Sequence, residues 1–116
     1  MPRFAFLLNH APDRYEGLSD DEAMVIFKDY MQWMEQAIRD GVCEGGHKLT
    51  TSGGKTLRAT DDGVEVHDSP LAELTEVLGG FMIVKADDPA AAVELARTHP
   101  HLVHNRTLEI RQLEGE

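Results

Sequence analysis

Residues 68 to 81 read Asp68-Ser69-Pro70-Leu71-Ala72-Glu73-Leu74-Thr75-Glu76-Val77-Leu78-Gly79-Gly80-Phe81. This stretch holds clustered carboxylates, a proline turn and two adjacent glycines, and it runs into the most apolar strand-like segment, Phe81-Met82-Ile83-Val84. A loop that only joins two elements needs none of these features, whereas loops on a rigid scaffold often carry binding groups. The stretch therefore predicts the entry into a central strand and the position of a candidate site.

A long amphipathic helix is predicted between residues 19 and 41. Ser19 and Glu22 have the spacing of a capping box, in which each side chain bonds to the backbone N–H of the other residue. Asp40-Gly41 ends the pattern, because glycine accepts the left-handed conformation that closes many helices. Between these ends the apolar residues recur every three or four positions, as one buried helix face requires; they are Ala23, Ile26, Phe27, Tyr30, Trp33, Met34, Ala37 and Ile38.

Strand patterns occupy much of the remaining chain. Short apolar or alternating runs are typical of strands; they cover residues 4–8, 42–50, 56–60, 64–67, 79–86 and 107–113. Asp61-Asp62-Gly63 is a hairpin signal between two of them. Asp88-Pro89 opens a second helix, with aspartate as the cap and proline at the first helical position, and His99-Pro100 ends it.

The order β-α-β, hairpin, β-α-β predicts an α+β fold of the ferredoxin-like kind, as one domain over residues 1–116. We expect a four-stranded antiparallel sheet with both helices on one face and an inserted hairpin. Apolar residues point both ways in residues 4–8 and 81–84, so the other sheet face is expected to be buried as well. The simplest partner is a second copy, which gives a homodimer through the sheet faces. A monomer whose hairpin shields part of the sheet is the alternative.

The composition excludes several classes of partner. The 116 residues include 11 Lys and Arg against 21 Asp and Glu, a net charge of −10. Nucleic acids and anionic membrane surfaces both require clustered basic residues, and the chain has no such cluster. One cysteine, Cys43, allows no intramolecular disulfide. No segment approaches the roughly 20 apolar residues of a membrane helix, and the N-terminus lacks signal-peptide features. We therefore expect a cytoplasmic protein.

The stretch from Asp68 to Phe81 resembles the signature of the YCII-related domain family, in particular its DGPF-type branch. The matching positions are Asp68, Pro70, Glu73, Glu76, Leu78, Gly79, Gly80 and Phe81. The likeness covers nearly the whole chain, including the early apolar strand, the start of the long helix, Tyr30, and the Glu-Leu-Ala-Arg-x-His-Pro run at the end of the second helix. Ser69 and Leu71 depart from the glycine and phenylalanine of the pattern.

This resemblance implies a dimeric α/β barrel assembled from ferredoxin-like subunits. Members of the family are proposed to be enzymes, because polar groups gather in a cleft. Some relatives act with a His–Asp pair on small cyclic molecules. The family pattern also places a His-Pro pair where His99 stands.

Four side chains are candidates for general acid–base catalysis: Asp68, Glu76, His99 and His10. Histidine titrates near neutrality, and a nearby carboxylate can orient it and raise its proton affinity. His10 directly follows the first strand, whose end can point into a cleft. Each residue also has a structural alternative: Asp68 can hold a turn, and His99 suits a helix C-terminus. Glu73 shares a helical face with Glu76 but is expected to be solvated surface.

No organic cofactor and no native metal are expected. His99, His101 and His104 are closely spaced, but Pro100 prevents a regular helical pair of ligands, and no carboxylate accompanies them in that run. Residues 53–56 end like a phosphate-binding loop without its preceding glycine spacing. Cys43 lies in an apolar run with no basic neighbour, which favours a packed thiol.

Three functions fit these residues. The first is a small-molecule enzyme that uses His and carboxylate side chains in a cleft. The second is a non-catalytic ligand-binding or regulatory homodimer, in which the same cleft binds a metabolite. The third is an interaction module, in which the motif is buried in the dimer seam and leaves no pocket.

Overall fold

The computed structural model describes residues 1–11, 17–50, 54–68 and 76–115. Its elements are β1 (Arg3–His10), α1 (Asp20–Arg39), β2 (Cys43–Lys48), β3 (Lys55–Thr60), β4 (Gly63–Asp68), β5 (Val77–Lys85), α2 (Pro89–Arg97), α3 (Pro100–Val103) and β6 (Thr107–Gln112). Every expected strand and helix is present, with ends that differ from the expected ones by about two residues. The short helix α3 was not expected.

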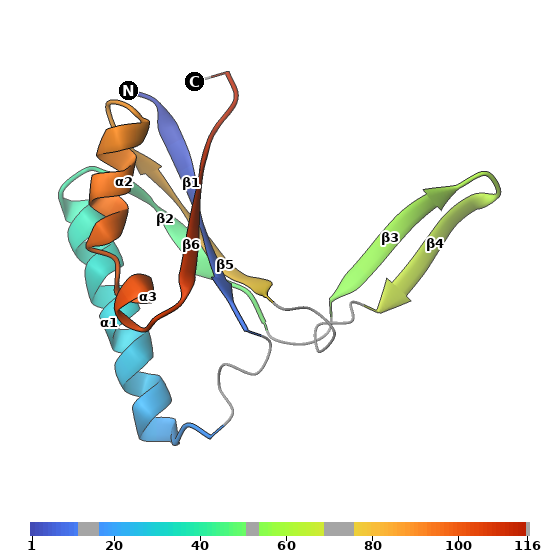
Figure 1. The fold of residues 1–116 in the computed structure, drawn as a ribbon, viewed down its shortest axis with the longest axis horizontal. Helices are drawn as coiled ribbons and strands as arrows, with labels where there is room; N and C mark the ends of the chain where they lie inside the picture. The colour runs from blue at the N-terminus through green and yellow to red at the C-terminus, as the bar shows by residue number, and fades with distance from the viewer. Residues whose placement is uncertain (12–16, 51–53, 69–75, 116) are drawn as a thin grey trace.

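The main sheet has the order β2-β5-β1-β6, and all of its neighbouring strands are antiparallel. This is the strand order of a ferredoxin-like fold, so the predicted fold class is confirmed. Figure 1 shows α1 and α2 together on one side of this sheet. The strand β1 is central, because it pairs with β5 on one side and with β6 on the other.

The two long helices begin where their capping residues predict. The Ser19 side chain accepts a hydrogen bond from the backbone N–H of Glu22, and the Glu22 carboxylate accepts one from the backbone N–H of Ser19. Asp88 caps α2 by accepting from the backbone N–H of Ala91 at 2.8 Å. Gly41 has a φ of +76° just after α1, which is the left-handed conformation expected at that end.

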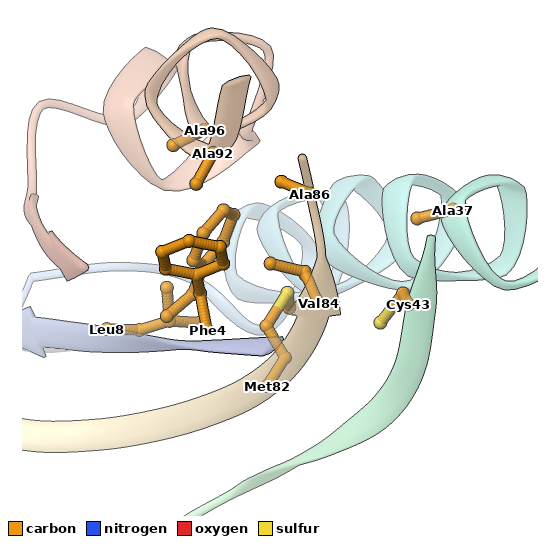
Figure 2. Packing of buried hydrophobic residues seen from close by; sticks show 10 residues of the cluster. Phe4, Leu8, Ala37, Cys43, Met82, Val84, Ala86, Ala92 and Ala96 are labelled. Atoms are coloured by element: carbon orange, nitrogen blue, oxygen red, sulfur yellow. The ribbon is translucent and has the colours of Figure 1, made fainter. Parts of the chain in front are cut away.

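The core lies between the sheet and its two covering helices. Alternate residues of β1 are buried, and Phe4 and Phe6 are at most 1% exposed. Opposite them on β5 lie Val84 and Met82, which are also buried. Figure 2 shows Phe4 directed toward the α2 side chains Ala92 and Ala96. The small side chains of α2 let this helix approach the sheet closely.

The opposite face of the sheet carries the residues between these core positions. Ala5 and Leu7 on β1, and Phe81 and Ile83 on β5, are paired in register and only partly exposed. No helix of the described chain covers this face in Figure 1. An apolar strip therefore runs along the centre of the uncovered face.

The strands β3 and β4 form a two-stranded sheet of their own. Figure 1 shows this hairpin extending away from the main sheet, on the side opposite the helices. All residues of both strands are exposed, so the hairpin does not shield the sheet. Its register places Leu57 opposite Val66 and Ala59 opposite Val64, which gathers the apolar side chains on one hairpin face.

Within the described residues, no helix has the length and apolar character needed to cross a membrane.

Candidate functional site

A cavity of about 590 Å³ lies between the N-terminal half of α1 and the adjoining ends of β2 and β5. Its walls are mostly apolar, with Met24, Phe27 and Met31 on α1 and Phe81 on β5. Met24 and Phe27 remain 51% and 48% exposed. Large apolar side chains around an open cavity are typical of a ligand site.

Polar residues line the cavity from two elements. Tyr30 and Asp20 come from α1, and His47 and Lys48 come from β2. Gly79 and Gly80, from the sequence signature, form part of the β5 wall. The glycine end of the signature therefore borders the cavity in the part of the chain that the structure describes.

His10, the last residue of β1, is 3% exposed and lies against Gly79. A Cβ atom on Gly79 would come within 2.2 Å of His10 Cδ2 and 2.5 Å of His10 Nε2, so only glycine allows the ring to lie there. The register shifts between Leu8 and Asn9, which pair with Gly80 and Leu78 and leave Gly79 as a bulge. Gly79 therefore combines a β-bulge with a close approach of the His10 ring.

The hydrogen bonds of His10 indicate its tautomer. His10 Nδ1 lies 2.5 Å from the carbonyl oxygen of Ala11. Because a carbonyl only accepts hydrogen bonds, Nδ1 carries a hydrogen and donates it. In the neutral ring the basic nitrogen is then Nε2, the atom that lies beside Gly79 of the cavity wall.

His99 is fully buried between α1 and α3 and caps α3 by accepting from the backbone N–H of His101 at 3.0 Å. Its ring lies 4.5 Å from that of Trp33 and 5.5 Å from that of Tyr30, between centroids. Burial, and secondly the charge that His101 would carry, lower the pKa of His99 from 6.5 to about 3. His99 is therefore neutral near pH 7. Its Nε2 atom is buried and has no hydrogen-bond partner in the described part of the chain.

His101 is also fully buried and joins three parts of the fold. Its Nδ1 lies 2.6 Å from the hydroxyl oxygen of Tyr30 on α1, and its Nε2 lies 2.7 Å from the carbonyl oxygen of Asn9 on β1. The sequence predicts Tyr30 as part of the buried face of the long helix, and it places His101 in a closely spaced histidine run with no assigned role. Pro100 is the sequence feature that could have indicated the position of His101, because proline at a first helical position predicts the short helix α3 that holds this residue.

The two carboxylates engage other neighbours. Asp68 ends β4 and forms an exposed ion pair with Lys55 of the hairpin. Glu76 accepts a hydrogen bond from the Thr107 hydroxyl at 2.7 Å. Ser69, Pro70, Leu71 and Glu73 of the signature lie outside the described residues.

The four predicted site residues therefore do not meet in one place in the described structure. His10 lies behind Gly79 of the cavity lining and does not itself line the cavity, whereas His99 lies in the neighbouring aromatic cluster. Asp68 and Glu76 stand at the two ends of the connector 69–75 in the sequence. Tyr30 belongs to both the cavity and the cluster. It is the residue that links them.

A metal-binding arrangement is not found in the residues that the structure describes, where no three His, Cys, Asp or Glu side chains are grouped to hold an ion. His104 pairs with the Asp29 carboxylate at 3.0 Å. The Cys43 thiol is buried, and burial raises its pKa. This agrees with the packed thiol expected at Cys43.

Comparison with known proteins finds a family and a fold. A family model described as "YCII-related domain" matches residues 3–113. No curated protein matches the chain. One similar solved structure is 5-chloro-2-hydroxyhydroquinone dehydrochlorinase from Burkholderia phenoliruptrix AC1100, in complex with 2,5-dihydroxybenzoquinone. It matches with a TM-score of 0.56 and 9% identity over 100% of this chain and 96% of that chain. At this identity the likeness concerns the fold.

The contact between His10 and Gly79 predicts a strong coupling between these positions. Gly79→Ala should reduce the free energy of unfolding by about 1–3 kcal/mol, because the new methyl group overlaps the His10 ring. In a His10→Ala background the same change should cost much less, since the three atoms nearest to the added methyl all belong to His10. Urea unfolding of the four proteins measures the coupling. An equal cost in both backgrounds would contradict the contact.

The buried neutral state of His99 predicts a loss of stability in acid. Its pKa is about 3 in the folded protein and 6.5 ordinarily, so between these values the unfolded chain binds more protons. This stabilisation is complete above pH 6.5 and is lost as the pH falls toward 3. From pH 7 to pH 5 the loss is about 2 kcal/mol.

His99→Asn keeps a capping acceptor for α3 and removes the titrating ring. Urea unfolding at pH 7 and pH 5 should therefore show a smaller loss for this variant than for the wild type. His67→Asn, on the exposed hairpin, is the matched control and should keep the wild-type pH dependence. The same pH dependence in wild type and His99→Asn would show that His99 does not hold a lowered pKa.

Proposed function

Because this chain belongs to the YCII-related domain family, we propose that it is a small-molecule enzyme that performs general acid–base catalysis in the cavity beside α1. The observation that carries the proposal is the position of His10. This histidine is buried at the end of a central strand, and its basic nitrogen lies behind Gly79, a lining residue of the cavity that has no side chain. A general base must lie within reach of the proton that it removes.

The cavity favours a small and largely apolar cyclic substrate. A volume of about 590 Å³ holds one small molecule, and the walls formed by Phe27, Tyr30 and the methionines of α1 suit a flat ring. Lys48, which pairs with the inward-facing Gly80, would attract the negative charge that appears when such a molecule loses a proton. The dehydrochlorinase of similar fold is bound to a small cyclic quinone, which supports this substrate class by analogy of fold.

The other predicted residues take supporting roles in this proposal. Asp68 and Glu76 remain candidates for orienting the substrate, although in the described residues Asp68 pairs with Lys55 and Glu76 accepts a hydrogen bond from Thr107. His99 is neutral near pH 7 and would serve by holding α3 in place rather than as a cationic acid.

Non-catalytic ligand binding by the same cavity is the second candidate. It is favoured by the carboxylates, since Asp68 and Glu76 are engaged by Lys55 and Thr107 in the described structure. In that case the cavity would bind a metabolite without turning it over.

Two chains would pair through the uncovered sheet faces. The central strip of Ala5, Leu7, Phe81 and Ile83 is apolar and lacks a covering element in the described chain. A second copy offers the same strip, which is what a two-fold interface requires. The hairpin extends on that same side and would flank the partner.

A thermal-shift screen of small cyclic compounds, followed by turnover measurements, tests the proposed activity. Binders should raise the midpoint of unfolding of the wild type by several degrees, because a ligand that binds only the folded state stabilises it. Ala23→Leu fills the cavity wall and should abolish this effect. Val25→Leu, which is on the same helix and 58% exposed, should retain it.

Binders are then incubated with the protein and followed by NMR for isomerisation, elimination or proton exchange. His10→Gln should bind as the wild type does and lose about 10²–10⁴-fold in rate. Binding without any turnover would favour the second candidate. Equal rates for His10→Gln and the wild type would rule out His10 as the base.

The dimer is tested by sedimentation at several protein concentrations. The wild type should sediment with the mass of two chains, and Ile83→Asp should sediment as one chain, because a carboxylate in a buried apolar seam is unfavourable. Val103→Asp, on α3 and 77% exposed, is the control and should remain a dimer. Dissociation by Val103→Asp alone would place the contact at α3 instead.

A further inference from the structure

Tyr30 occupies a position that the proposed activity does not yet use. It lines the cavity, and its hydroxyl group lies 2.6 Å from the Nδ1 atom of His101. His101 is fully buried and Tyr30 is partly exposed, so the pair connects the cavity to the interior. The two residues are 71 positions apart in the sequence, and only the packing of α3 against α1 brings them together.

The hydrogen bonds around His101 determine the direction of each donor. Its Nε2 lies 2.7 Å from the Asn9 carbonyl oxygen, which can only accept, so Nε2 carries a hydrogen. In the neutral ring Nδ1 is then an acceptor, and the Tyr30 hydroxyl donates its hydrogen to it. This is the arrangement in which an imidazole can take the proton of a hydroxyl group.

We propose that Tyr30 and His101 form a proton-transfer pair for a phenol, enol or similar acidic ring compound bound in the cavity. The proposal rests on the proposed function only in that the cavity binds such a molecule. It adds a catalytic residue, Tyr30, and a positioning residue behind it, His101.

The transfer step conserves atoms and charge. The bound molecule gives its O–H or acidic C–H proton to the Tyr30 oxygen, while Tyr30 gives its own hydroxyl proton to His101 Nδ1. The products are the anion of the bound molecule, neutral Tyr30 and the imidazolium of His101. The reverse transfer returns the proton, to the same atom or to another atom of the ring, which would give a tautomer.

The surroundings of His101 suit this step. The Asn9 carbonyl accepts from Nε2 in both charge states and would stabilise the imidazolium. The ring of His99, 6.2 Å away between centroids, is neutral near pH 7 and does not repel it. Tyr30 also lies 6.0 Å from the ring of His104, whose partner is the Asp29 carboxylate. Lys48 at the cavity would attract the anion of the bound molecule.

The test uses 4-nitrophenol as the probe, because its phenolate is yellow and its neutral form is not. Wild-type protein should bind the probe and lower its apparent pKa by roughly one unit, a tenfold gain of the ionised form. Tyr30→Phe keeps the aromatic wall and should bind within about threefold of the wild type, but it should lose this shift. His67→Asn, on the hairpin, should behave as the wild type.

Nitrogen NMR of His101 supplies a readout that a structural role would not change. In the free protein its signals should show hydrogen on Nε2 only, and addition of 4-nitrophenol should protonate Nδ1 in the wild type but not in Tyr30→Phe. A hydrogen on Nδ1 in the free protein would overturn the proposal. So would an unchanged probe shift in Tyr30→Phe, which would leave the cavity and His10 as the proposed site. Failure of the wild type to bind the probe would count against both proposals.

Discussion

The structure depends on the register of β1 between β5 and β6. This strand is central, and its alternation directs Phe4, Phe6, Leu8 and His10 to the same face as the helices. The first three positions build the core on which α1 and α2 pack. The fourth continues the same face past the end of the core and lies against Gly79, a lining residue of the cavity. The strand β1 therefore supplies both core residues and His10, the candidate base. The backbone hydrogen bonds that pair β1 with β5 and β6 fix the position of both.

Local sequence patterns predict the parts of this molecule that local physics controls. Ser19 with Glu22, and Asp88 with Pro89, mark helix starts because a cap needs only its own neighbours. The element order then leaves few ways to arrange the sheet. The Tyr30–His101 contact and the neutral state of His99 depend instead on packing between segments far apart in the sequence. Residue spacing predicts contacts only between near neighbours in the sequence. The histidine run is therefore visible in the sequence, but its contacts with the long helix are not.

The buried histidines give this acidic chain an unusual interior. His99 and His101 are fully buried, and the aromatic rings of Tyr30 and Trp33 pack around them. Such a cluster fills space as an aromatic core would, and it also offers hydrogen-bonding nitrogen atoms. Trp33 and Tyr30 each make one hydrogen bond across to the segment that holds these histidines, to Thr98 at 2.9 Å and to His101 at 2.6 Å. The cluster thus orients α3 and, with it, the groups that border the cavity.

The bulge at Gly79 changes which residues of β5 face the core. Before it, Val77 faces the core at 8% exposure while Leu78 is 44% exposed; after it, the even-numbered Gly80, Met82 and Val84 face inward. The extra residue shifts the alternation of inward and outward side chains by one position, between Leu78 and Gly80. Loss of that one glycine would exchange Val77 and Leu78 between core and solvent and leave the strand beyond it unchanged. The inward-facing positions of β5 are therefore odd-numbered before Gly79 and even-numbered after it, and the bulge at Gly79 is where the change occurs.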